Sequence, residues 1–277
     1  MPADREPAGP PVLDVRPQAA FTALHRRGAA NIPLDQLARR IHELPPRDTP
    51  VIVFDDVAIR ARWAASRLRA RRRPVADVAH GRDWLLAGPT ESGPCAVRLW
   101  QPHALLVEAV RWAERLWGGT AGRRAADLAC GTGRDPVWLA LHGLDVEAWD
   151  ILPDALERCR ELADRNGARV RTTMRDLEAV GAIESGSFDL VSCFNFLHRP
   201  LMKDIAERVR PGGLAVYETF VDPQRELFGK PSRDAHILRR GELPSFFIGW
   251  EILISREGLA GERRMAASLV ARKPLTR

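Results

Sequence analysis

The residues of this chain that could carry chemistry gather around a tight glycine turn, Gly131-Thr132-Gly133. An apolar stretch that contains Asp127 precedes the turn, and an apolar helix pattern follows it. A second apolar stretch ends at Asp150, nineteen residues after Gly131. A strand, a Gly-x-Gly turn and a helix form the nucleotide crevice of a doubly wound sheet, and an acid at the next strand end accepts hydrogen bonds from ribose hydroxyls. The spacing therefore predicts a site for a cofactor that carries a ribose.

The charge beside the turn distinguishes two classes of cofactor. A nicotinamide dinucleotide usually has a third glycine three residues after the second, where this chain has Pro136. Its diphosphate would also meet Asp135 at the start of the helix, where an acid disfavours an anion. A sulfonium cation is not repelled by Asp135. S-adenosylmethionine is therefore predicted in preference to a dinucleotide.

Apolar strand segments alternate with amphipathic helix patterns through the second part of the chain, and together they must position the turn. Strands are expected around Asp127 and over 144–150, 170–174, 188–194, 214–220, 250–255 and 265–271, with helices over 105–116, over 153–167 and before Val209. This alternation predicts an α/β fold with a Rossmann-like sheet of seven strands. A third acid, Asp176, follows the third of these strands.

The segment from about Arg98 to Lys273 resembles the class I S-adenosylmethionine-dependent methyltransferases, because the glycine turn and the acids occur in the same order and spacing. The resemblance implies that Asp127, Gly131 and Gly133 line the methionine side of the cofactor. It implies that Asp150 holds the ribose hydroxyls. The bland alternative for the two glycines is a tight turn with no ligand.

The same resemblance assigns the remaining cofactor contacts. It implies that Asp176 and Leu177 contact the adenine and that the segment from Cys193 to Phe196 borders the sulfonium. For Asp176 the alternative is a helix cap. Cys193 is expected to be a small apolar residue near the cofactor.

Further motifs narrow the likeness to the tellurite-resistance-like branch of this superfamily. They are Arg98-Leu99-Trp100-Gln101-Pro102, Gly131-Thr132-Gly133-Arg134-Asp135, His198-Arg199 and Glu218-Thr219-Phe220. After Asn195 the chain lacks the Pro-Pro of enzymes that methylate amides or exocyclic amines. This likeness implies a small-molecule methyl acceptor that is a soft nucleophile, such as a thiol or a chalcogen oxyanion.

Two residues after the fourth strand are the candidate catalytic residues. His198 and Arg199 are expected to orient an anionic acceptor, and His198 is expected to act as a base if the acceptor is protonated. The alternative is that His198 packs on the core and that Arg199 caps a helix or pairs with an acid.

The first ninety residues also alternate strands and helices, which predicts a small parallel sheet. Strands are expected over 12–15, 51–54 and 75–78, and helices around Phe21, over 34–44, over 58–72 and around Trp84. The segment from about residue 12 to residue 86 resembles a rhodanese-like domain. The resemblance rests on Leu13-Asp14-Val15-Arg16, His25 with the segment 28–34, the strand 51–54, and Trp84.

At Asp55 the chain departs from the rhodanese-like family in a way that affects the predicted activity. The resemblance places the catalytic cysteine at Asp55 and an arginine at Arg60. A carboxylate cannot hold a persulfide, and no cysteine precedes Cys95. The domain is therefore predicted to be inactive in sulfur transfer. It is expected either to bind a protein or small ligand, or to be a packing unit that retains no ligand.

Composition bounds the remaining function classes. The formal net charge of +6 comes almost wholly from arginine, with lysine only at Lys203, Lys230 and Lys273, so a nucleic-acid partner is not expected. No apolar run long enough for a membrane helix occurs, the start of the chain lacks a signal-peptide pattern, and neither the histidines nor the cysteines form a metal motif. Unpaired cysteines indicate a reducing cytoplasm.

These inferences combine into one leading hypothesis and two alternatives. The chain is predicted to have two domains, 1–93 and 94–277, with a linker at 88–94. The leading hypothesis is an S-adenosylmethionine-dependent methyltransferase of a small molecule, fused to a rhodanese-like domain without sulfurtransferase activity. The alternatives are a non-catalytic sensor of the same cofactor and a nicotinamide-dependent reductase.

Overall fold

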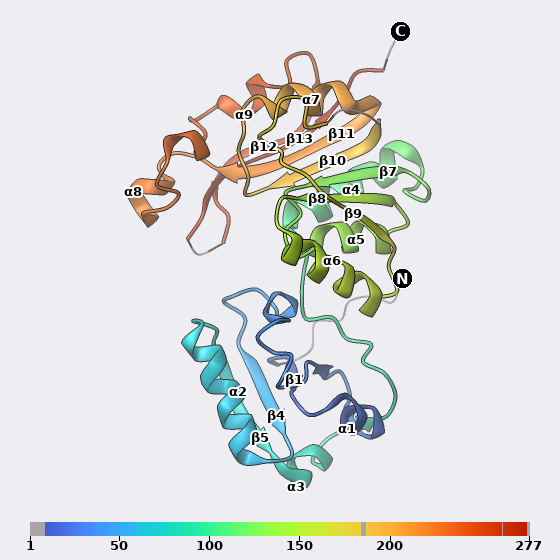
Figure 1. Cartoon of the computed structure of the whole chain (residues 1–277), viewed down its shortest axis with the longest axis vertical. Helices are drawn as coiled ribbons and strands as arrows, with labels where there is room; N and C mark the ends of the chain where they lie inside the picture. The colour runs from blue at the N-terminus through green and yellow to red at the C-terminus, as the bar shows by residue number, and fades with distance from the viewer. Residues whose placement is uncertain (1–8, 184–186, 262, 276–277) are drawn as a thin grey trace. The chain divides into compact units, whose positions relative to one another are not determined.

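Apolar strands and the helices between them build one larger sheet in each half of the chain (Figure 1), and the first half also contains a two-stranded sheet. The computed structural model describes residues 9–183, 187–261 and 263–275. The chain divides into two compact units, Met1–Gln101 and Pro102–Arg277. The residues before Gly9, where no signal peptide is expected, lie outside the described residues. No helix in the described ranges is long and apolar enough to cross a bilayer.

The first unit contains a parallel sheet with the strand order β3-β1-β4-β5. Its strands are β1 (Val12–Asp14), β3 (Ala30–Asn31), β4 (Val51–Asp55) and β5 (Val75–His80), and its helices are α1 (Gln18–Ala23), α2 (Ala58–Ala70) and α3 (Gly81–Leu86). The α2 helix buries Ala61, Ala64, Ala65 and Leu68. The small side chains on this face let the helix pack closely on the sheet.

Two predictions for the first unit are corrected. The segment 34–44 is not a continuous helix, because turns lead into a short 3₁₀ helix, η1 (Ile41–Glu43), while Leu37 and Leu44 still reach the core. The segment 88–94 is not a free linker: β6 (Thr90–Glu91) pairs with β2 (His25–Arg26), and the Gly93 amide donates to the Thr22 carbonyl at 2.8 Å. Apolar spacing and composition carry no signal for such long-range pairing.

The second unit contains the predicted sheet of seven strands, in the order β12-β13-β11-β10-β7-β8-β9. Its strands are β7 (Arg124–Leu128), β8 (Asp145–Asp150), β9 (Val170–Met174), β10 (Phe188–Phe194), β11 (Val209–Phe220), β12 (Glu251–Leu259) and β13 (Met265–Arg272). Only β13 runs antiparallel to its neighbours β11 and β12; the other pairs are parallel. The mixed α/β class predicted from the sequence is confirmed.

Helices cover both faces of this sheet. They are α4 (Ala104–Trp117), α5 (Arg134–Leu141), α6 (Pro153–Arg165), α7 (Leu201–Arg208), α8 (Gln224–Phe228) and α9 (Glu242–Ser245), with a 3₁₀ turn, η2 (Asp234–His236). The α4 and α5 helices pack on one face, and α7 with the α9 region packs on the other. All of β10 is therefore buried, because each of its faces lies under a helical layer.

Strand β11 starts earlier than expected. The turn predicted at 211–213 lies inside β11, and the register with β10 shifts between Phe188 and Leu190 to accommodate it. A Cβ on Gly213 would lie 2.8 Å from the Asp189 carbonyl oxygen, so this close passage of two backbones requires glycine.

Candidate active site

The predicted crevice lies where the order of the sheet reverses. Strand β7 pairs with β8 on one side and with β10 on the other, and Asp127 is level with Ser192 of β10 and Ala148 of β8. Chain connections leave β7 and β10 on opposite faces, which opens a crevice at their carboxyl ends. Asp127 and the Gly131 turn lie at this point.

Asp127 is a buried carboxylate that forms no ion pair with the residues described by the structure. The residue is only 1% exposed, and its Oδ1 accepts a hydrogen bond from the Ser192 hydroxyl at 2.5 Å. That is its one side-chain hydrogen bond within the described ranges. Burial, and next the neighbouring Asp135 carboxylate, raise the pKa of Asp127 well above its ordinary value. A buried carboxylate in this state is suited to a ligand that brings a positive charge.

The two glycines of the turn have different surroundings. Both have positive φ, +54° at Gly131 and +90° at Gly133. A Cβ on Gly131 would meet nothing within 4 Å, whereas one on Gly133 would lie 2.4 Å from Sγ and 2.8 Å from Cα of Cys159 in α6. Gly133 therefore permits the contact of its turn with α6, and Gly131 leaves open space where a ligand can approach the backbone.

Asp150 holds the turn in place. Its Oδ2 accepts the Gly131 amide at 2.8 Å, and its Oδ1 accepts the Leu152 amide at 2.9 Å. The structure thus brings Asp150 to the glycine turn, as the spacing predicted. Each carboxylate oxygen retains a second lone pair for a ribose hydroxyl. That contact stays a prediction.

The residues predicted to contact the adenine have separate environments. Asp176 is exposed, and its Oδ1 accepts the Glu178 amide at 2.9 Å within a turn, so the helix cap considered as the alternative is not formed. The Leu177 side chain is buried in the core, so its backbone is what remains available to a ligand. The adenine contacts stay predictions.

Cys193 and Phe196 lie at the end of β10 and just beyond it. Cys193 is fully buried, and burial raises the pKa of its thiol, so it packs as an apolar residue. The Phe196 ring packs against the core, while its carbonyl oxygen accepts the Tyr217 hydroxyl at 2.7 Å. This hydrogen bond ties the loop after β10 to β11.

The two predicted catalytic residues differ in their contacts with the described residues: the Arg199 side chain is held by several hydrogen bonds, and that of His198 is not. Arg199 forms two contacts with Glu242, at 2.5 Å from Nε to Oε1 and 2.9 Å from Nη2 to Oε2, and donates to the carbonyls of Ala235 and Ile237. The Arg199 guanidinium lowers the pKa of Glu242. His198 is half-buried and has no side-chain hydrogen bond within the ranges that the structure describes. Their role in orienting an acceptor stays a prediction.

The contacts of Arg199 give a testable stability effect. We expect Arg199→Ala to destabilise the chain by about 1–2 kcal/mol, because it leaves Oε1 of Glu242 and the two carbonyls without this donor, while Oε2 of Glu242 keeps the Arg239 amide. Glu242→Gln should cost a similar amount, and the exposed Lys203→Ala should cost little. Thermal unfolding of the three variants measures this. An unchanged melting temperature in Arg199→Ala would contradict an anchoring role.

A polar network that the sequence did not point to surrounds the predicted site. His103, at the start of α4, contacts Asp135 through its backbone amide at 2.8 Å and through Nδ1 at 2.6 Å. Its Nε2 lies 3.1 Å from Nδ2 of Asn195, whose Oδ1 accepts from Arg264 at 2.5 Å. Arg264 also pairs with Glu218. His103 and Arg264 carried no local motif, and only the fold brings them together.

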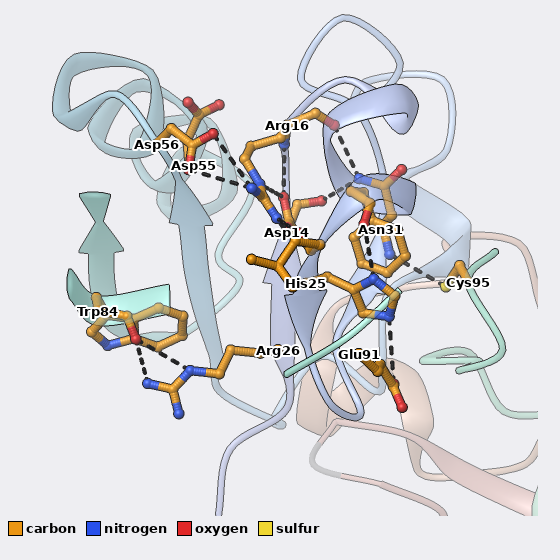
Figure 2. A network of polar contacts seen from close by, with 12 residues as sticks. Asp14, Arg16, His25, Arg26, Asn31, Asp55, Asp56, Trp84, Glu91 and Cys95 are labelled. Atoms are coloured by element: carbon orange, nitrogen blue, oxygen red, sulfur yellow. Dashed lines mark hydrogen bonds and ion pairs between the residues drawn. The ribbon is translucent and has the colours of Figure 1, made fainter. Parts of the chain in front are cut away.

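The first unit carries a second site, the loop after β4. Asp55 is 2% exposed, and its carboxylate accepts the Val57 amide and the Arg60 Nε, both at 3.0 Å. The carboxylate thus takes up donors of its own loop. Next to it, Arg16 bridges Asp14 at 2.7 Å and Asp56 at 3.3 Å (Figure 2). This ion-paired cluster holds the ends of β1 and β4 together.

Comparison with known proteins finds a match to a family model in each unit. Residues 125–213 match the family described as a methyltransferase domain, and residues 3–86 match the rhodanese-like domain. A ubiquinone biosynthesis O-methyltransferase of Bordetella avium is 28% identical over 184 residues, covering 62% of this chain and 75% of the relative. The Schizosaccharomyces pombe protein UNK4.09 is 24% identical over 285 residues, and the match covers 83% of this chain and 82% of the yeast protein.

A solved structure shares the fold of part of the chain. The crystal structure of TehB from Haemophilus influenzae superposes with a TM-score of 0.50 at 22% identity. The match covers 60% of this chain and 62% of TehB, which is less than two thirds of that protein. The likeness concerns the fold.

Proposed function

Since the chain carries a rhodanese-like domain at residues 3–86 and a methyltransferase domain at residues 125–213, we propose that it is an S-adenosylmethionine-dependent methyltransferase that acts on a small molecule. The methyltransferase domain supports the predicted cofactor. When bound, S-adenosylmethionine supplies a methyl group activated by a positively charged sulfur. The acceptor and the state of the rhodanese-like domain are the further parts of this proposal.

The observation that carries the proposal is the buried Asp127 carboxylate beside the open space at Gly131. The cofactor brings an ammonium group and a sulfonium, and Asp127 would hold the ammonium with a charge-assisted hydrogen bond. Gly131 would allow the close approach of the backbone, and Asp150 would accept hydrogen bonds from the ribose. The residues present therefore fit this group.

The protein's contribution to methyl transfer is mainly alignment. Displacement at a methyl carbon requires the acceptor atom, the carbon and the leaving sulfur to lie in line, and holding two reactants in that geometry accounts for much of the rate. The network at His103, Asn195 and Glu218 borders the end of β10, where the acceptor would lie. Relatives named O-methyltransferases extend the acceptor class from thiols to hydroxyl compounds.

Turnover tests this proposal against a non-catalytic sensor. The purified chain is incubated with S-adenosylmethionine and a low-molecular-weight cell extract, and S-adenosylhomocysteine and new methylated compounds are measured by mass spectrometry. We expect product formation that depends on both extract and chain and is absent with Asp127→Asn. Binding of the cofactor without any turnover would favour the sensor.

For the first unit we propose that the rhodanese-like fold is retained without sulfur transfer. The resemblance places the family's cysteine at Asp55. The Asp55 carboxylate accepts the Val57 amide and Arg60 Nε, and an anionic sulfur at this position would need the same donors. We expect no thiosulfate:cyanide sulfurtransferase activity. Asp55→Cys should acquire one thiosulfate-derived sulfur, detectable by intact-mass measurement, and Asp55→Ser should not. Sulfur transfer by the unaltered chain would contradict the proposal.

A further inference from the structure

His103 is held in one orientation by contacts on three sides. Its backbone amide and Nδ1 both bind the Asp135 carboxylate, at 2.8 and 2.6 Å. Its ring stacks on Phe194, with centroids 4.2 Å apart and the planes parallel. The side chain is 17% exposed, so one edge of the ring stays accessible. Such double anchoring is more than a helix start requires, since the backbone contact alone satisfies that amide.

The partners of the two ring nitrogens define the tautomer. Burial acts to raise the pKa of Asp135, but the adjacent His103 outweighs it and holds the pKa below its ordinary value. An ionised Asp135 only accepts hydrogen bonds, so Nδ1 carries the proton, and in the neutral imidazole Nε2 then presents a lone pair. The orientation of the Asn195 amide supports this tautomer. Arg264 donates to Oδ1 of Asn195, so the NH₂ group of Asn195 faces Nε2 of His103.

The accessible edge of His103 lies beside the end of β10. Asn195 directly follows this strand and has a left-handed backbone, with φ of +57°. Asparagine adopts this conformation more readily than most other non-glycine residues, and here it turns the chain out of β10. The Asn195 amide group donates to Nε2 in the structure. A hydroxyl or thiol in its place would make the same contact.

Resting on the methyltransferase function proposed above, we propose that His103 is a catalytic base, that Asp135 is its positioning residue, and that the acceptor is a hydroxyl or thiol compound which binds with its proton. As the acceptor atom forms its bond to the methyl carbon, its proton passes to Nε2 of His103. The bond from the methyl carbon to sulfur breaks, and its electron pair stays on sulfur. The resulting imidazolium is stabilised by Asp135 and returns its proton to water.

This assignment narrows the class of acceptor. A fully deprotonated chalcogen oxyanion has no proton to give, so it would gain nothing from a base. It would also meet the Asp135 carboxylate beside His103, whereas the Glu218 carboxylate is paired with Arg264. A neutral hydroxyl or thiol can instead donate to Nε2, which is the direction in which Asn195 already donates.

The test compares His103→Asn with the unaltered full chain. Asparagine can keep an N–H directed at Asp135 but provides no base. Catechol and thiophenol serve as acceptor probes, formation of S-adenosylhomocysteine gives the rate, and calorimetry gives the affinity for S-adenosylmethionine. His142→Asn is the matched control, because His142 also bonds through Nδ1, to the Trp138 carbonyl, away from this network.

We expect His103→Asn to lower the rate at saturating cofactor by about a hundredfold or more, with unchanged cofactor affinity. Asp135→Asn should do the same, because its amide can put the ring proton on Nε2, and imidazole should restore part of the rate to His103→Ala. Near-normal rates in folded His103→Asn would overturn the inference. So would a chain that binds the cofactor and methylates selenite but neither probe. Loss of cofactor binding by the unaltered chain would instead contradict the proposed function itself.

Discussion

Asp127→Asn is expected to weaken binding of S-adenosylmethionine by at least about a hundredfold and, at the same time, to stabilise the free chain at neutral pH. Asparagine keeps the size of the side chain and an oxygen for the Ser192 hydroxyl. It removes the negative charge that the ligand's ammonium group requires. Calorimetric titration measures the first effect, and thermal unfolding the second.

The gain in stability follows from the direction of the pKa shift. The pKa of Asp127 lies well above its ordinary 3.8 because of burial and the nearby Asp135. Between the unfolded and folded pKa values the folded state binds more protons, so its stability falls as pH rises through this window. The Asp127→Asn variant does not undergo this loss of stability. Its gain in the free energy of unfolding over the unaltered chain should therefore be small at acid pH and largest above the folded-state pKa of Asp127.

A matched variant separates this effect from a general change in charge. Asp164 is exposed on α6, so Asp164→Asn should change neither the stability nor the cofactor affinity. An Asp127→Asn variant that is less stable than the unaltered chain at neutral pH would contradict the account of Asp127 as an uncompensated buried acid.

The second large effect is expected at Gly133. Gly133→Ala should destabilise the chain by about 3 kcal/mol or more, because the new Cβ meets the Cys159 backbone at a positive φ. In a unit of this size that corresponds to a fall in melting temperature of roughly 6–12 °C. Differential scanning calorimetry measures it.

Gly131→Ala is the matched comparison. Its Cβ has free space, so only the left-handed backbone is penalised, by about 1–2 kcal/mol. The methyl group should nevertheless weaken the binding of S-adenosylmethionine, because it fills the space where the ligand approaches. Equal destabilisation by the two substitutions would contradict the different roles assigned to Gly131 and Gly133.

The sequence was sufficient for elements with a strong apolar pattern. The run 188–194, which is apolar except for Asp189 and Ser192, predicted a strand, and β10 is that strand. The Gly131 turn and Asp150 were predicted together from their spacing, and the structure joins them by a hydrogen bond. In these cases local chemistry and the tertiary fold favour the same arrangement.

Other features depend on partners distant in the chain. The segment 88–94 looks like a linker in composition, but its pairing with β2 depends on His25 and Arg26 far upstream. His103 lies 32 residues before Asp135 and 92 before Asn195, without a motif to relate them. Both predicted glycine roles rested on one turn pattern, and only the position of Cys159 distinguishes Gly133 from Gly131.

The most direct test of the account is a calorimetric titration of the full chain with S-adenosylmethionine, repeated in two buffers of different ionisation enthalpy and on Asp150→Ala. The account predicts one-to-one binding that releases protons increasingly as the pH is lowered from neutral, since the ligand requires ionised Asp127 and the pKa of that residue is raised in the free chain. Binding should be weakened in the Asp150 variant. The absence of binding at millimolar ligand would contradict the methyltransferase assignment.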